Sequence, residues 1–137
     1  MEHIWPELLL FIFAGITLLG HIGLKDRRPQ LMTFIALFGL LAAMVVLLTT
    51  LNYETHELFS RSFLIDPVSQ FFKVLLIFSG AIGVLLTFMS NEVDRTEKAE
   101  MHALILLGTL AMCVLCSAVH FLVLYLAYEM IGVTGFV

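Results

Sequence analysis

The chain has 137 residues, of which 61% are hydrophobic and 13% are charged, and its formal net charge is −4 at pH 7. Soluble domains carry about a quarter of charged residues, and apolar runs long enough to cross a hydrocarbon core of about 30 Å recur along this chain. Composition therefore excludes an ordinary soluble domain and indicates an all-α polytopic membrane protein. The basic residues form no stripe beyond Lys25, Arg27 and Arg28, which gives no support to nucleic-acid binding.

The first apolar run, residues 6–24, follows an acidic N-terminus and precedes the basic residues. A cleaved signal peptide has the reverse order of charges, so we expect a retained helix, with Trp5 at the membrane interface. An uninterrupted apolar stretch predicts a second span over 31–51. The polar connection at 52–66 alternates enough to form a small surface hairpin or a short amphipathic helix.

Asp66 and Pro67 predict a helix start, with the Asp as N-cap and the Pro at the first helical position. A third span over 68–90 follows, and then a solvated loop at 91–100. From Met101 the apolar run would make a single helix of about 52 Å, far longer than the bilayer core is thick. It therefore predicts two spans, 102–118 and 121–137, with a turn within "CSAVHF".

The small residues inside these spans have ordinary structural interpretations. Cys113 and Cys116 lie in an apolar run without further metal ligands, and we interpret them as buried small hydrophobic residues. Gly80 and Gly83 offer a surface for close helix packing.

Basic residues in the loops predict the orientation. The first and third loops hold Lys25, Arg27, Arg28, Arg95 and Lys98, against Arg61 alone in the second loop. We therefore expect the first and third loops in the cytoplasm and the N-terminus outside. Glu129 would then lie about 12 Å into the fifth span, close to the midplane.

Three side chains are candidates for function. An ionisable group at the bilayer centre costs about 2.5–3.5 kcal/mol on insertion scales, and for Glu129 a proton- or ion-relay role is favoured over a structural carboxyl bonded to a neighbouring helix. Lys73, about 9 Å into the third span, is interpreted first as a lysine that snorkels to the interface, with an inward-facing role as the alternative. His120 is expected to satisfy the turn backbone, with proton exit as the alternative, and His21 and His102 are expected at cytoplasmic interfaces.

The stretches "SFLIDPVSQFFKVLLIFSGAIGVLLTFMS" and "EKAEMHALILLGTLAMCVLCSAVHFLVLYLAYEMIGVTGFV" resemble the N-terminal part of the antiporter-like subunits of respiratory complex I. The resemblance is strongest to subunit N, the counterpart of mitochondrial ND2. It rests on the Asp-Pro-x-x-x-Phe-Phe start of the third helix, the acidic loop with Glu100 and the "HFLxLYLAYE" approach to a fifth-helix glutamate. It covers essentially the whole chain, and residues 117–131 are its most specific piece.

The resemblance implies a helical bundle built from inverted repeats with broken helices. It implies that Glu129 contributes to proton translocation by pairing with a lysine of a later helix, and that quinone, FMN and iron–sulfur clusters bind elsewhere in the complex, with no cofactor on this chain. Since no such lysine follows Glu129 here, we expect 1–137 to be a single membrane domain from a longer subunit, inactive alone.

The expected partners are other membrane subunits of complex I, among them neighbouring antiporter-like and small membrane subunits, together with lipid and the remainder of its own subunit. The expected location is the bacterial inner membrane. The alternatives are a small structural or assembly membrane protein, or the related subunit of a cation/proton antiporter or membrane-bound hydrogenase complex. The choice between proton and sodium stays open.

Overall fold

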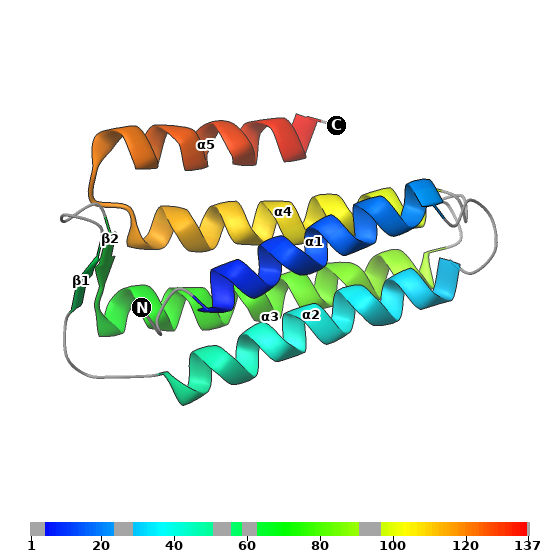
Figure 1. Ribbon diagram of the computed structural model, residues 1–137, viewed down its shortest axis with the longest axis horizontal. Coiled ribbons are helices and arrows are strands. Elements are labelled where there is room, and N and C mark those ends of the chain that lie inside the picture. The colour runs from blue at the N-terminus through cyan, green and yellow to red at the C-terminus, as the bar shows by residue number, and fades with distance from the viewer. Residues whose placement is uncertain (1–4, 24–28, 51–55, 59–62, 91–96, 137) are drawn as a thin grey trace.

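The computed structural model describes residues 5–23, 29–50, 56–58, 63–90 and 97–136. Five helices lie lengthwise beside one another: α1 (Trp5–Gly23), α2 (Pro29–Thr49), α3 (Pro67–Met89), α4 (Lys98–Ser117) and α5 (Phe121–Phe136) (Figure 1). Helices α2, α3 and α4 are long and apolar enough to cross a membrane, and α1 and α5 are shorter apolar helices. The expected all-α membrane bundle of five helices is confirmed.

The polar connection before α3 forms the hairpin that was one of its two predicted structures. Strand β1 (His56–Leu58) pairs antiparallel with β2 (Phe63–Ile65), with His56 opposite Ile65. The hairpin lies at the end of the bundle where α1, α3 and α5 begin, which we call the hairpin end (Figure 1). The basic loop residues 25, 27, 28, 61 and 95, which predicted the orientation, lie outside the described residues.

Helix α3 starts where the Asp-Pro pair predicted. The Asp66 carboxylate accepts a hydrogen bond from the Ser69 backbone N–H at 2.8 Å, and the Ser69 hydroxyl accepts one from the Asp66 N–H at 3.2 Å. This reciprocal arrangement is a capping box, with Ser in place of the usual Glu or Gln. The cap fixes the first turn of α3 at the hairpin end.

Helix α4 begins at Lys98, four residues before the expected start at residue 102. The Lys98 ammonium donates to the carbonyl oxygens of Phe88 and Ser90, at 3.0 and 2.7 Å. A cation at these last carbonyls of α3 is favourable, as is Glu100 in the first turn of α4, because of the helix dipoles. Residues 91–100 were predicted as a solvated loop, whereas the last three of them, 98–100, belong to α4.

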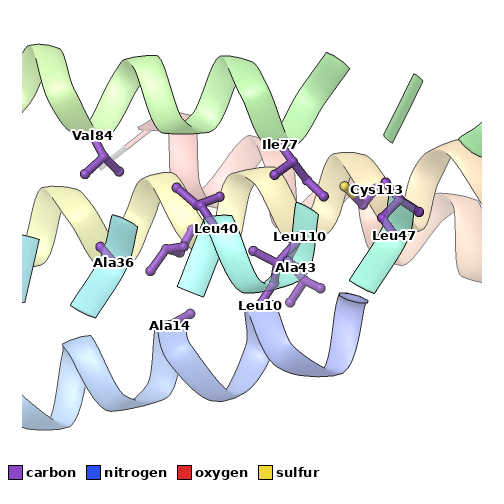
Figure 2. Packing of buried hydrophobic residues seen from close by; sticks show 11 residues of the cluster. Leu10, Ala14, Ala36, Leu40, Ala43, Leu47, Ile77, Val84, Leu110 and Cys113 are labelled. Carbon is purple, nitrogen blue, oxygen red and sulfur yellow. The ribbon is translucent and has the colours of Figure 1, made fainter. Parts of the chain in front are cut away.

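Helices α1 to α4 enclose a core of small and branched apolar side chains, among which Leu10, Leu40, Ile77 and Leu106 are fully or almost fully buried (Figure 2). The helices approach closely where glycines lie. An added Cβ at Gly80 would lie 2.5 Å from Thr109 Oγ1 on α4. Small residues at contacts are what helix association in lipid requires, since lipid tails are as apolar as the side chains.

Helix α5 lies along α4 at one edge of the bundle (Figure 1). The two helices come together near Gly108, whose added Cβ would lie 3.4 Å from Thr134 Oγ1. Ala127 is the buried residue of α5, while Phe121, Tyr128 and Phe136 are widely exposed. Most of the α5 surface is therefore free of contacts within the described part of this chain.

Candidate functional site

Glu129 lies in the middle of α5, about 12 Å along the helix from Phe121. Its side chain is exposed, on a helix whose other exposed residues are apolar or aromatic. The Tyr125 hydroxyl, one turn earlier on the same face, is hydrogen-bonded to the Glu129 carboxylate. Among the described residues no lysine or arginine forms an ion pair with it.

This placement differs from that of an ordinary buried carboxyl. A charged or polar group inside a bilayer nearly always faces a bundle interior or a water-filled cavity and pairs with another group. Within the described residues Glu129 faces no bundle interior, and Tyr125 is its contact. The face of α5 that carries Glu129 is therefore not covered by the other described helices.

Lys73 forms an ion pair with Glu7, which joins α3 to α1. The exposed fractions of the two side chains are 3% for Lys73 and 13% for Glu7. The snorkelling interpretation that was preferred for Lys73 is therefore wrong, because its ammonium points into the bundle and is neutralised there. Lys73 is also no partner of Glu129. From the sequence, Glu7 was interpreted only as part of an acidic N-terminus, and its role as the counter-ion of Lys73 was not predicted.

Further polar groups surround this ion pair at the hairpin end. Gln70 is buried one turn before Lys73 on the same face of α3. On α4, Cys113 is buried close enough to Glu7 and Lys73 to be influenced by both charges, and Ser117 is buried one turn further toward the hairpin end. One oxygen of Glu7, Oε2, and the Ser117 hydroxyl are buried without a hydrogen-bond partner in the part of the chain that the structure describes.

Asp66 completes this group at the surface. Its carboxylate accepts a hydrogen bond from the Ser69 backbone N–H, and this bond lowers the pKa of Asp66 below its ordinary value of 3.8. The more distant Lys73 charge acts in the same direction. Asp66 is therefore ionised at neutral pH and lies at the start of α3, at the hairpin end.

The histidines have structural placements. His120 is exposed in the turn between α4 and α5, and its Nδ1 accepts the Leu122 backbone N–H at 3.4 Å, so it caps the first turn of α5. His102 is fully buried, against the interfacial placement that was expected, because the earlier start of α4 carries it one turn into the bundle. Neither of its ring nitrogens makes a hydrogen bond to another described residue. The side chain of His21 lies outside the described residues.

The other buried hydroxyls are satisfied locally. Thr17, Thr87 and Thr109 each donate to a carbonyl of the preceding turn of their own helix, at 2.7–2.9 Å. Such bonds leave no free donor and mark structural positions. Cys113 and Cys116 are both free thiols, Cys113 buried in the core cluster and Cys116 partly buried. Among the described residues, the polar groups without a local structural partner are thus at Glu129, at His102 and around the Glu7–Lys73 pair.

Known proteins similar to this chain are named as subunits of quinone oxidoreductases and of a dehydrogenase. NADH-quinone oxidoreductase subunit N of Beijerinckia indica subsp. indica is 33% identical over 100% of the chain. NAD(P)H-quinone oxidoreductase subunit 2 of Microcystis aeruginosa is 29% identical over 97% of it, and F(420)H(2) dehydrogenase subunit N of Methanosarcina mazei is 28% identical over 96%. No family model matches the chain.

The matches cover 28%, 26% and 28% of these three relatives, so the chain spans about a quarter of their length. The resemblance to subunit N that the helix starts and the "HFLxLYLAYE" stretch indicated is confirmed by this similarity over nearly the whole chain.

Proposed function

We propose that this chain is part of a membrane-arm subunit of a proton-translocating NADH:quinone oxidoreductase, to which it contributes Glu129 as a proton-translocating carboxylate. The observation that carries the proposal is the position of Glu129, exposed in the middle of an apolar helix at the edge of the bundle. The similarity to subunit N supports the same function. The chain binds no redox group in this proposal, and quinone reduction takes place on other subunits.

The mechanism follows from the charge state of Glu129. A basic side chain on a neighbouring helix would stabilise the carboxylate, while separation of the two in a low-dielectric surrounding would favour the protonated form. A change in that pairing, driven by the redox reaction, would make Glu129 take up and release a proton. Tyr125, hydrogen-bonded to Glu129, would hold the carboxyl orientation during this cycle.

In the membrane the hairpin end would face outside and the 24–28 and 91–97 connections would face the cytoplasm. The loop charges support this orientation. The partners would be the neighbouring antiporter-like and small membrane subunits, and the location a bacterial inner membrane. The relative from Methanosarcina mazei is named as a subunit of an F(420)H(2) dehydrogenase. A complex of the same kind that takes its electrons from F420H2 in place of NADH is therefore the nearest alternative.

The test is Glu129→Gln in the full complex, reconstituted in proteoliposomes. We expect normal assembly with a large loss of proton pumping and of coupled quinone reduction, because Gln keeps the hydrogen bonding and cannot be charged. Glu129→Asp should be milder, since the charge remains. Glu97→Gln, which neutralises an exposed carboxylate next to α4 outside the apolar spans, is the matched control and should pump normally.

Two other functions give different results. A structural or assembly protein, in which Glu129 docks a partner helix, predicts that Glu129→Gln lowers the amount of assembled complex while the assembled part pumps fully. A cation/proton antiporter subunit predicts sodium transport that depends on Glu129. Full proton pumping by a normally assembled Glu129→Gln complex would contradict the relay function.

A further inference from the structure

The Glu7–Lys73 ion pair lies close to the hairpin end, in a part of the bundle well separated from Glu129. Glu7 is in the first turn of α1, and Lys73 is about 9 Å from the start of α3. Glu129 is on α5, which lies along the opposite side of α4 from α1 (Figure 1). The two carboxylates are therefore separate sites on separate helices.

A purely structural role, in which the ion pair holds α1 against α3, is a weak explanation for this pair. The desolvation of two charges offsets much of their attraction, so that a buried ion pair often stabilises no more than apolar side chains of similar size. The four-helix core beside it is already closed by apolar contacts among Leu10, Leu40 and Ile77. An ion pair here adds two protonatable groups to a core that packs without them.

Polar side chains connect the pair with the hairpin end. Gln70 and Lys73 follow one another at helical spacing on the buried face of α3, which continues with Ile77, and Asp66, one turn before Gln70, is the partly exposed N-cap of the helix. Polar groups occupy this face from the cap of α3 to Lys73, and apolar groups dominate beyond it. The path from the pair therefore leads to the hairpin end.

Two buried oxygens, one on α1 and one on α4, are further hydrogen-bond acceptors. Glu7 Oε2 and the Ser117 hydroxyl are both buried without a partner among the described residues. Buried polar atoms in proteins are almost always hydrogen-bonded, so each of these two oxygens can accept a hydrogen bond from a proton donor or a bridging water. The other titratable groups that the charges of the pair influence are Asp66 at the cap of α3 and the thiols of Cys113 and Cys116 on α4.

We propose that Glu7 and Lys73 form a second proton-binding site, which exchanges its proton with the aqueous phase at the hairpin end along the Asp66–Gln70 face of α3. In the resting pair Lys73 is an ammonium ion and Glu7 a carboxylate. When the two side chains separate, uptake of one proton forms the O–H bond of a neutral Glu7 carboxyl and leaves Lys73 charged, and release breaks that bond when they pair again. Proton binding by this pair is independent of the proposed function, whereas its use in pumping rests on it.

The experiment is infrared difference spectroscopy on the full complex in proteoliposomes, with a pH step at the hairpin-end side and no redox turnover. We expect a carboxyl C=O band in the wild type that is lost in Glu7→Gln and retained in Glu129→Gln. Glu97→Gln is the control and should retain it. Absence of the band in the wild type, or its persistence in Glu7→Gln, would overturn the proposal.

A second variant covers the case in which Glu7→Gln does not assemble. The exchange Glu7→Lys with Lys73→Glu keeps one charge of each sign and should show the band at a shifted frequency, because the carboxyl is now carried by α3. An exchanged complex that assembles without any band shift contradicts the site. If the pair is only a structural contact between α1 and α3, the wild type shows no Glu7 band, and Glu7→Gln combined with Lys73→Gln restores assembly; this result also overturns the proposal.

The outcomes also separate this site from the proposed function of Glu129. Loss of pumping in Glu129→Gln with an intact Glu7 band supports both. Full pumping in Glu129→Gln with an intact Glu7 band refutes the relay role and keeps the second site.

Discussion

Replacement of Gly80 by Ala tests whether close contact between α3 and α4 holds the bundle together. The new Cβ would lie 2.5 Å from Thr109 Oγ1 and 3.3 Å from Thr109 Cγ2, while ordinary contact begins at 3.4 Å. Thr109 cannot simply rotate away, because its hydroxyl donates to the Ile105 carbonyl at 2.7 Å. The helices must therefore separate by about 0.9 Å at this point.

Overpacking of a well-packed core lowers the free energy of unfolding by about 1–3 kcal/mol. The change from Gly to Ala within a helix raises it by about 0.5–1 kcal/mol. We therefore expect Gly80→Ala to lower the free energy of unfolding by roughly 0.5–2 kcal/mol. Gly83 provides a matched control one turn away on the same helix. Its added Cβ would meet Ile105 at 3.7 Å, an ordinary contact, so Gly83→Ala should be neutral or stabilising.

The assay is SDS titration of the purified chain in mixed micelles, followed by circular dichroism. Thr109→Ala removes both clashing atoms, so it should restore most of the stability lost in Gly80→Ala. Equal stability of the Gly80→Ala and Gly83→Ala chains, or no rescue by Thr109→Ala, would refute the close approach of α3 and α4 at this glycine.

Two further predictions use the same assay. Asp66→Ala removes the N-cap of α3 and should destabilise the chain by about 1 kcal/mol. The Ser69 backbone hydrogen bond lowers the pKa of Asp66 in the folded chain. The stabilisation by the ionised cap is therefore complete above the unfolded pKa of 3.8 and is lost as the pH falls through the lower folded pKa. If the stability difference between the wild type and Asp66→Ala stays constant down to a pH well below 3.8, the cap is contradicted. Leu106→Ala empties a fully buried position and should cost about 2 kcal/mol, the low end of the range for soluble cores, because lipid gives no transfer term. Phe121→Ala, at a side chain that is 79% exposed, should change stability little, and a larger loss there than at Leu106 would contradict the observed core.

The order and positions of the helices could be predicted from the sequence because apolar runs of bilayer length leave few alternatives. The turn before α5 was predicted within "CSAVHF" from the same lengths, and the start of α3 was predicted from the preference of Asp for the N-cap and of Pro for the first helical position. The start of α4 was missed, since hydropathy assigns charged residues to loops. Lys98 belongs to the helix because it binds the last carbonyls of α3, a contact that is visible only when both helices are placed.

The Glu7–Lys73 pair was missed for a related reason. Depth along a helix says how far a lysine lies from the interface, and a depth of about 9 Å permits both snorkelling and inward pairing. The rotation of α3 about its axis decides between them, and that rotation depends on packing against α1. A usable signal was present, since Glu7 and Lys73 carry opposite charges within the first two turns of helices that start at the same end.

The fully buried His102 shows how a small error in a helix boundary becomes a large error in environment. Moving the start of α4 by four residues takes this ring from the interface into the core. The position of Glu129 on an exposed face could not be predicted either, because its helix is apolar on all sides and gives no preferred direction.

The short turn between α4 and α5 has a consequence for how the chain enters the membrane during synthesis. Residues 118–120 join two antiparallel helices that touch at Gly108 and Thr134, and His120 caps the second of them. Two such helices can leave the translocon together as a hairpin, so that the insertion cost of Glu129, about 2.5–3.5 kcal/mol, is shared by both apolar segments. The contact between α4 and α5 would then hold the carboxylate in place as it enters the bilayer.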